Sequence, residues 1–164
     1  VAQQCATVCS SAAPENDVHA RFREVLAIEP CDAFVRVCAD SPLLDPALVD
    51  HAVSALLGGQ CDIVRNKRYP AGQSVESIKT EAFLHADPAV LDEFEREHVM
   101  PYYLRRPARF LRGVLSAEKD YRRHRMVVDT QEDFDRIRRI IERMDRPHWE
   151  YGWRQCLALL PPVS

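Results

Sequence analysis

The stretch AFVRVCADSPLLDPALVDHAV, residues 33–53, decides the fold class. Apolar residues alternate along positions 33–39, as in a strand of a covered sheet. Asp45 and Pro46 then supply a good N-cap and a good first helical residue, and apolar residues recur at helical spacing until Gly58. A strand followed by a short turn and a helix is the repeating unit of α/β proteins. Because ligands bind beyond the carboxyl ends of strands in open α/β sheets, Asp40 is a candidate site residue.

Strand and helix patterns continue to either side of this unit. The predicted strands cover residues 6–10, 33–39, 61–65, 74–79, 110–116 and 125–129. The predicted helices cover residues 14–29, 46–58, 81–85, 88–99, 131–144 and 149–160. The chain shows no internal repeat, and 164 residues suit a single domain with its own core, residues 1–164.

Composition narrows the class of protein. No apolar run approaches the roughly 20 residues that span a bilayer, and no charged segment precedes an apolar one at the N-terminus. The six cysteines form no Cys-x-x-Cys pair, and Cys31, Cys38 and Cys61 lie in or beside strand-like segments. We therefore predict reduced, buried thiols in a cytoplasmic protein that neither spans nor binds a membrane.

Charge is divided unevenly along the chain. Residues 1–104 contain 8 basic and 16 acidic side chains, whereas residues 105–164 contain 14 basic and 9 acidic ones. Nearly all the basic residues of the C-terminal third are arginines, which suit phosphate or carboxylate recognition. A solvated surface or a subunit contact explains the same composition. The net charge of −3 and the lack of interleaved aromatic and basic residues argue against nucleic-acid binding.

Two aspartates stand at predicted strand ends, Asp40 after residues 33–39 and Asp129 after residues 125–128. Each precedes a predicted helix, so both side chains can reach one rim of the sheet. Paired carboxylates there would suit Mg²⁺, a hard cation that prefers oxygen ligands and brings phosphates with it. The alternative is structural: Asp129 or Thr130 caps the next helix and Asp40 fixes a turn. Residues Thr130 to Asp133 resemble a capping box with Asp in place of the usual Glu or Gln.

Four segments in order resemble the bacterial cytidylyltransferases of the spore-coat polysaccharide type: VRVCADSPLLDP, YPAGQSVESIKTEAF, EREHVMPYYLRRPARF and MVVDTQEDFDRIRRIIE. That family is similar to the enzymes that load acylneuraminate or Kdo sugars onto CMP. The resemblance covers about residues 5–144. Its most specific parts are Asp40 with Pro42-Leu43, the string from Glu97 to Tyr102, and Asp129-Thr130 with Glu132-Asp133.

The resemblance implies an α/β, three-layer nucleotide-diphospho-sugar transferase (GT-A-like) fold with a mixed, mostly parallel sheet. It also implies the reaction of a sugar with CTP to give CMP-sugar and pyrophosphate. Asp40 and Asp129 would be the catalytic residues that hold Mg²⁺, because such transfers depend on positioning and charge neutralisation. Glu76, Glu97 and His98 would lie toward the sugar. Residues 69–78 correspond to an arm through which relatives dimerise, which predicts a homo-oligomer.

The resemblance is incomplete at the N-terminal end. Family members begin with a strand and a glycine-rich loop that cradles the triphosphate, but no glycine precedes Gly58 here. We therefore expect a truncated fold that starts near the family's third strand and is inactive or altered as it stands. We also expect the sheet edge left open to be covered by the N-terminal segment or a second subunit. The alternative function is a non-catalytic oligomerising or interaction module that uses the basic C-terminal third.

Overall fold

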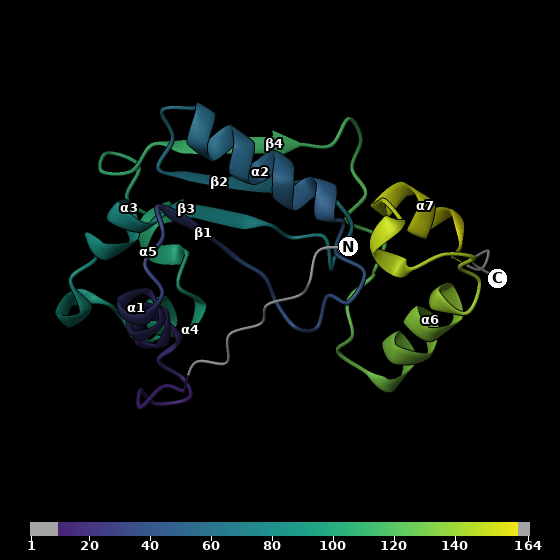
Figure 1. Cartoon of the computed structure of the whole chain (residues 1–164), viewed down its shortest axis with the longest axis horizontal. Helices are drawn as coiled ribbons and strands as arrows, with labels where there is room; N and C mark the ends of the chain where they lie inside the picture. The colour runs from purple at the N-terminus through teal and green to yellow at the C-terminus, as the bar shows by residue number, and fades with distance from the viewer. Residues whose placement is uncertain (1–9, 161–164) are drawn as a thin grey trace.

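The computed structural model describes residues 10–160 (Figure 1). Its strands are β1 (Ala33–Arg36), β2 (Ile63–Lys67), β3 (Glu76–Lys79) and β4 (Arg112–Ser116). Its α-helices are α1 (Val18–Ile28), α2 (Pro46–Gly58), α3 (Thr80–Leu84), α4 (Glu93–His98), α5 (Pro101–Leu104), α6 (Gln131–Ile141) and α7 (Trp153–Ala158). Two 3₁₀ turns, η1 (Pro88–Val90) and η2 (His148–Glu150), complete the described part. The strand predicted over residues 6–10 lies almost wholly outside it.

Helix α2 forms where the sequence predicts it. The Asp45 carboxylate accepts a hydrogen bond of 2.8 Å from the amide of Ala47, and Pro46 occupies the first turn. Its buried face consists of Leu48, Ala52 and Leu56. The helix lies along one face of the sheet, as Figure 1 shows. The α/β prediction is therefore confirmed at this unit.

The sheet has the strand order β1-β3-β2-β4. Strand β3 pairs antiparallel with both β1 and β2, and only β2 and β4 pair in parallel. The prediction of a mostly parallel sheet is therefore wrong for the pairing, although the sheet is mixed. The physical reason is that β3 returns from β2 after residues 68–75, a connection too short for the helical crossover that a parallel neighbour requires.

Both faces of the sheet carry buried apolar side chains. Neighbouring residues of a strand point to opposite faces, and Ile63 and Val64 of β2 belong to different core clusters. Ile63 packs in a cluster with residues of α1, α3 and α5, whereas Val64 packs with α2, α6 and α7. The sheet therefore separates two cores. The three-layer arrangement stays an expectation.

Three local predictions are wrong, and one of them is the single helix over residues 149–160, which is divided between η2 and α7. Residues 125–129 form a single parallel bridge from Arg125 to Ala71 rather than a strand. The chain changes partner within this segment, because the amide of Met126 bonds to Ala71 and that of Val128 to Asp40. The helix predicted over residues 88–99 is broken between η1 and α4, where the Asp92 side chain forms a capping box with Glu95.

The four cysteines of the described residues are free thiols, as predicted. Cys31 and Cys38 are exposed, however, so the prediction that they are buried is wrong. Both lie just outside the short strand β1, beyond the residues that the core covers. Cys156 is buried, and burial raises the pKa of its thiol to about 11. None of the helices in residues 10–160 has the length and apolarity needed to cross a membrane.

Candidate functional site

The backbone brings Asp40 and Asp129 to one place. The amide of Val128 donates a hydrogen bond of 2.9 Å to the carbonyl oxygen of Asp40. Since Val128 precedes Asp129 directly, the two aspartates belong to adjoining segments although they are far apart in the sequence. Both are exposed, and the Ser41 hydroxyl donates to the Asp40 carboxylate at 2.8 Å. The two predicted metal ligands therefore share one rim of the molecule.

The turn that contains Asp40 is fixed from the opposite side by Gln73, whose side chain is fully buried. Its amide nitrogen Nε2 donates to the Leu43 carbonyl oxygen at 2.6 Å, and its Oε1 accepts from the Asp45 amide at 2.9 Å. A buried amide that satisfies two backbone groups of the same turn restrains that turn. Gln73 lies in the quoted YPAGQ segment but was not among the predicted site residues.

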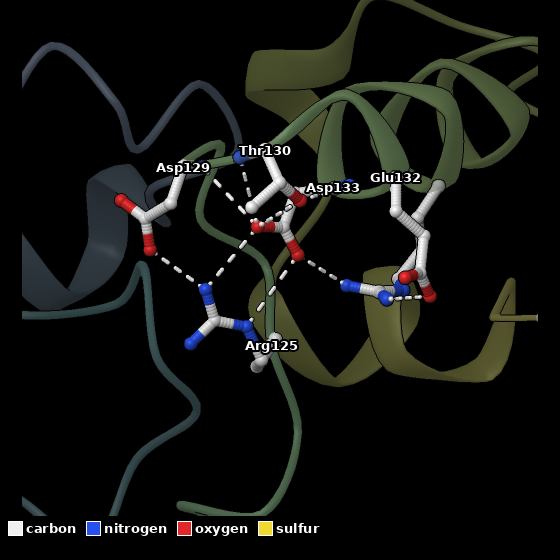
Figure 2. A network of polar contacts seen from close by, with 6 residues as sticks. Arg125, Asp129, Thr130, Glu132 and Asp133 are labelled. Atoms are coloured by element: carbon white, nitrogen blue, oxygen red, sulfur yellow. Dashed lines mark hydrogen bonds and ion pairs between the residues drawn. The ribbon is translucent and has the colours of Figure 1, made fainter.

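Asp129 belongs to a polar network at the start of α6 (Figure 2). The Nη2 atom of Arg125 lies 2.6 Å from Oδ2 of Asp129 and 3.2 Å from Oδ2 of Asp133. Arg136 contacts Asp133 from the helix, with 2.6 Å between its Nη1 and Oδ1. Asp133 is buried with 4% of its side chain exposed, whereas 54% of the Asp129 side chain is exposed.

Asp133 is the centre of this network. Its Oδ2 accepts from the amides of Asp129 and Thr130, each at 3.2 Å. The Thr130 hydroxyl accepts from the Asp133 amide, which completes the predicted capping box with Asp in the position usual for Glu or Gln. The hydrogen bond from Arg125, with those from Arg136 and the backbone, holds the pKa of Asp133 well below its usual range. Asp133 therefore stays ionised and shapes the segment that presents Asp129.

Arg125 and Asp133 are members of the site that the sequence does not predict as such. In the sequence, Arg125 is one of the arginines of the basic C-terminal third, and Asp133 belongs to the capping box of the next helix. Their spacing contained a usable signal, because Arg125 stands four residues before Asp129 and eight before Asp133, across a capping box. That spacing lets one guanidinium reach both carboxylates.

Glu76 lies at the start of β3, where it forms a 3.0 Å ion pair with Arg36 of β1. Both side chains are about three-quarters buried, with 23% and 24% exposed. Arg36 is the last residue of β1 and leads into the turn that contains Asp40. Glu76 therefore lies level with the carboxyl end of β1, the end from which the chain continues to Asp40. Its negative charge is neutralised by Arg36.

Glu97 and His98 lie elsewhere. Both are exposed on α4, which packs against α1 at the far end of the molecule from α6 (Figure 1). His98 packs edge-on against Phe94, with ring centroids 4.3 Å apart. The chain then turns sharply at the buried Val99, which has φ +63° and ψ −66°, a strained conformation for a β-branched residue. The structure does not bring these two side chains to the aspartates, and their role toward a sugar stays a prediction.

A groove of about 610 Å³ lies at the carboxyl end of β2. Three of its lining residues are cationic and none is acidic; the lining comprises Asn66, Lys67, Arg68, Tyr69, Pro70, Ala71, Ser74 and Arg122. Ala71 also forms the bridge to Arg125, so one wall of this cationic groove adjoins the Arg125–Asp129 pair. An anionic group bound in the groove would therefore lie beside the aspartate rim.

The donor set at the rim is small. Within residues 10–160, no three His, Cys, Asp or Glu side chains gather closely enough to hold a metal ion between them. Asp40 and Asp129 would offer two carboxylates, which suits Mg²⁺ because this ion keeps several waters and takes further oxygens from substrate phosphates. Two carboxylates would not suit a metal that requires a complete set of protein ligands. The types of donor present therefore suit a magnesium ion shared with a phosphate-bearing ligand, and the magnesium site itself stays a prediction.

Comparison with known proteins identifies the family. Residues 1–153 match the family model described as cytidylyltransferase. The chain belongs to the cytidylyltransferase family. The chain is also similar to the spore coat polysaccharide biosynthesis protein SpsF of Bacillus subtilis, with 26% identity over 138 residues, 81% of this chain and 57% of SpsF. An uncharacterised protein of Methanocaldococcus jannaschii, MJ1063, is 32% identical over 122 residues, 73% of this chain and 50% of that protein.

The fold agrees with the family. A cytidylyltransferase structure from Leptospira borgpetersenii superposes with a TM-score of 0.81, covering 91% of this chain and 67% of that one at 20% identity. This likeness confirms the cytidylyltransferase fold that the sequence motifs predicted. The chain spans about half the length of the curated relatives it matches, so their whole-protein activities do not transfer to it directly.

Proposed function

We propose that this cytidylyltransferase family member supplies the metal and acceptor side of a centre that transfers CMP from CTP to a sugar with release of pyrophosphate. The observation that carries the proposal is the hydrogen bond from the Val128 amide to the Asp40 carbonyl oxygen. This bond supports a shared position for Asp40 and Asp129, beside a cationic groove. Family membership and the likeness to SpsF support the reaction class.

Within this proposal, Asp40 and Asp129 hold the divalent cation, which supplies charge neutralisation to the phosphates when it is bound. Lys67 and Arg68 attract the anionic part of a substrate into the groove. The Glu76–Arg36 pair fixes the end of β1 from which the Asp40 turn departs. The chain's own residues therefore contribute positioning and electrostatics.

The alternative function, an interaction module that uses the basic C-terminal third, has less support than the metal-dependent transfer. Seven of the 13 arginines in this third pair with acidic residues of the same chain: Arg105, Arg106, Arg122, Arg125, Arg136, Arg138 and Arg154. Positive charge neutralised within the fold is less available to an acidic partner. The cationic groove is the better candidate for contact with an anion.

The test is the thermal unfolding of the chain with and without MgCl₂ and CTP. A cation at about 100 times its Kd stabilises by about 2.7 kcal/mol, which raises Tm by roughly 5–10 °C. We expect this rise in the wild type and in Asp50→Asn, a control at an exposed α2 carboxylate. Asp40→Asn and Asp129→Asn should each remove it. Equal responses in all four proteins would refute the metal assignment.

Turnover is a separate measurement. Because no glycine precedes Gly58, the chain offers no glycine-rich loop ahead of β1 to cradle a triphosphate. We therefore expect residues 1–164 to bind the cation without releasing pyrophosphate from CTP in the presence of sugar acids. Pyrophosphate release at a rate that depends on Asp40 would contradict the expectation that residues 1–164 are inactive, and would show that they catalyse the transfer themselves.

A further inference from the structure

Arg125 contacts two carboxylates of very different character (Figure 2). Its Nη2 atom lies 2.6 Å from Oδ2 of Asp129, and its Nε and Nη2 atoms lie 3.4 and 3.2 Å from Oδ1 and Oδ2 of Asp133. Asp133 is buried in the turn, whereas Asp129 is exposed and directly follows Val128, whose amide bonds to the Asp40 carbonyl oxygen. One guanidinium thus links a structural carboxylate to a candidate metal ligand.

The two contacts differ in how easily they break. Asp133 also binds Arg136, the Thr130 hydroxyl and two backbone amides, so this side of the network is fixed. The Arg125–Asp129 pair is exposed, with 47% and 54% of the side chains accessible. Exposed ion pairs contribute little to stability and exchange readily with water and ions. The Asp129 contact is therefore the one that an incoming cation can replace.

We propose that Arg125 is an internal counter-ion of the metal site, which occupies the Asp129 carboxylate until a divalent cation replaces it. This inference rests on the proposed function, because it takes Asp129 as a ligand of the cation. Arg125 keeps its contacts to Asp133 when it yields Asp129, so the exchange needs no refolding of the turn. The positive charge that stays nearby opposes cation binding. Cation affinity is consequently low until substrate phosphates add negative charge to the rim.

A purely structural Arg125 leads to the opposite expectation. If the guanidinium only braced the turn, its removal would loosen Asp129 and weaken cation binding. If it competes for Asp129, its removal strengthens cation binding even though the turn loses one contact. The sign of the affinity change therefore separates the two roles.

The experiment is a titration with MnCl₂ in which electron paramagnetic resonance counts the free Mn²⁺. The proteins are the full chain, Arg125→Met, and Arg138→Met, a control at an exposed arginine of α6 that pairs with Asp135 and lies outside the groove. We expect Arg125→Met to bind Mn²⁺ about tenfold more tightly than the wild type, and Arg138→Met to stay within about twofold. Adding Asp129→Asn to Arg125→Met should abolish the gain.

Equal or weaker Mn²⁺ binding by Arg125→Met, with binding retained in the wild type, would overturn the role of Arg125 and leave the proposed function standing. Absence of Mn²⁺ binding in both proteins would overturn the metal assignment and this inference together.

A second measurement avoids the variant if Arg125→Met does not fold. The side-chain ¹⁵N–¹H signals of Arg125 and Arg136 are followed in the wild type during addition of MgCl₂. We expect the Arg125 signal to shift as its Asp129 contact is lost, and the Arg136 signal to stay in place. An Arg125 signal unchanged at saturating Mg²⁺ would overturn the inference.

Discussion

The carboxylate of Asp45 accepts a hydrogen bond of 2.9 Å from the amide of Trp153, 108 residues later in the chain. The same carboxylate caps α2 through Ala47, and it is buried. One side chain therefore joins the start of α2, close to the Asp40 turn, to the start of α7. It satisfies orphan amides at two helix N-termini, which each leave such donors unpaired.

Replacing Asp45 with alanine should destabilise the protein by about 2–3 kcal/mol, because both helix starts lose an acceptor in a buried place. The matched control is Asp87→Ala. Asp87 also precedes a proline and accepts from the amide two residues later, but it is exposed and caps only η1. We expect the control to cost less than about 1 kcal/mol. Urea denaturation of both variants measures the difference, and similar costs would show that the link to α7 contributes nothing.

Gly72 should tolerate no side chain. It has φ +89°, and a Cβ atom there would lie 2.3 Å from the carbonyl oxygen of Met126. We expect Gly72→Ala to cost at least about 2 kcal/mol, since the backbone must shift away from the segment that leads to Asp129. Gly58→Ala is the control, because nothing lies within 4 Å of the added methyl at the end of α2. Thermal unfolding should show a lower Tm for Gly72→Ala alone.

The cationic groove should bind anions such as pyrophosphate. Arg68→Gln should weaken the binding of inorganic pyrophosphate by up to about tenfold, because the groove lining then keeps only Lys67 and Arg122, and Arg122 is already paired with Asp120. Arg143→Gln serves as the control, since Arg143 follows α6 and its side chain bonds to the Leu159 carbonyl oxygen outside the groove. Calorimetric titration at low salt measures both. A loss of affinity shared by the two variants would indicate general surface charge as the cause.

The features that the sequence predicted correctly are those coded by neighbouring residues. Asp45-Pro46 and the capping box from Thr130 to Asp133 specify helix starts through contacts within three residues, and both helices begin there. The family motifs predicted the fold and brought Asp40 and Asp129 forward as candidates. Local chemistry and motif order therefore account for most of what was predicted.

What the sequence did not predict depends on distant partners. Strand β3 separates β1 from β2, and nothing in residues 74–79 states which strands it will join. Residues 125–129 have a strand-like composition but divide their hydrogen bonds between Ala71 and Asp40, so no ladder forms. Arg125 gains its place in the site only once the turn around buried Asp133 exists. These outcomes arise from packing in three dimensions, which overrides local preference.

His19 should make the stability of the protein depend on pH. His19 is buried, its ring stacks on Phe83 at 4.5 Å, and its Nε2 hydrogen-bonds to the Tyr103 hydroxyl at 2.9 Å. The Tyr103 hydroxyl donates to the Phe83 carbonyl oxygen, so the imidazole must donate to Tyr103. Burial, with the nearby charge of Arg23, lowers the pKa of His19 from 6.5 to about 4.

Between these two pKa values the unfolded chain binds a proton at His19 that the folded chain excludes. Stability therefore falls as the pH falls from about 6.5 to about 4, with up to about 3 kcal/mol lost through this group. His19→Phe keeps an aromatic ring against Phe83 and should remove that part of the pH dependence. His85→Gln, at an exposed histidine of the same fold, should keep it. Urea denaturation at pH 7 and pH 4.5 gives the change for each protein, and a change in His19→Phe as large as in the wild type would contradict a neutral, buried His19.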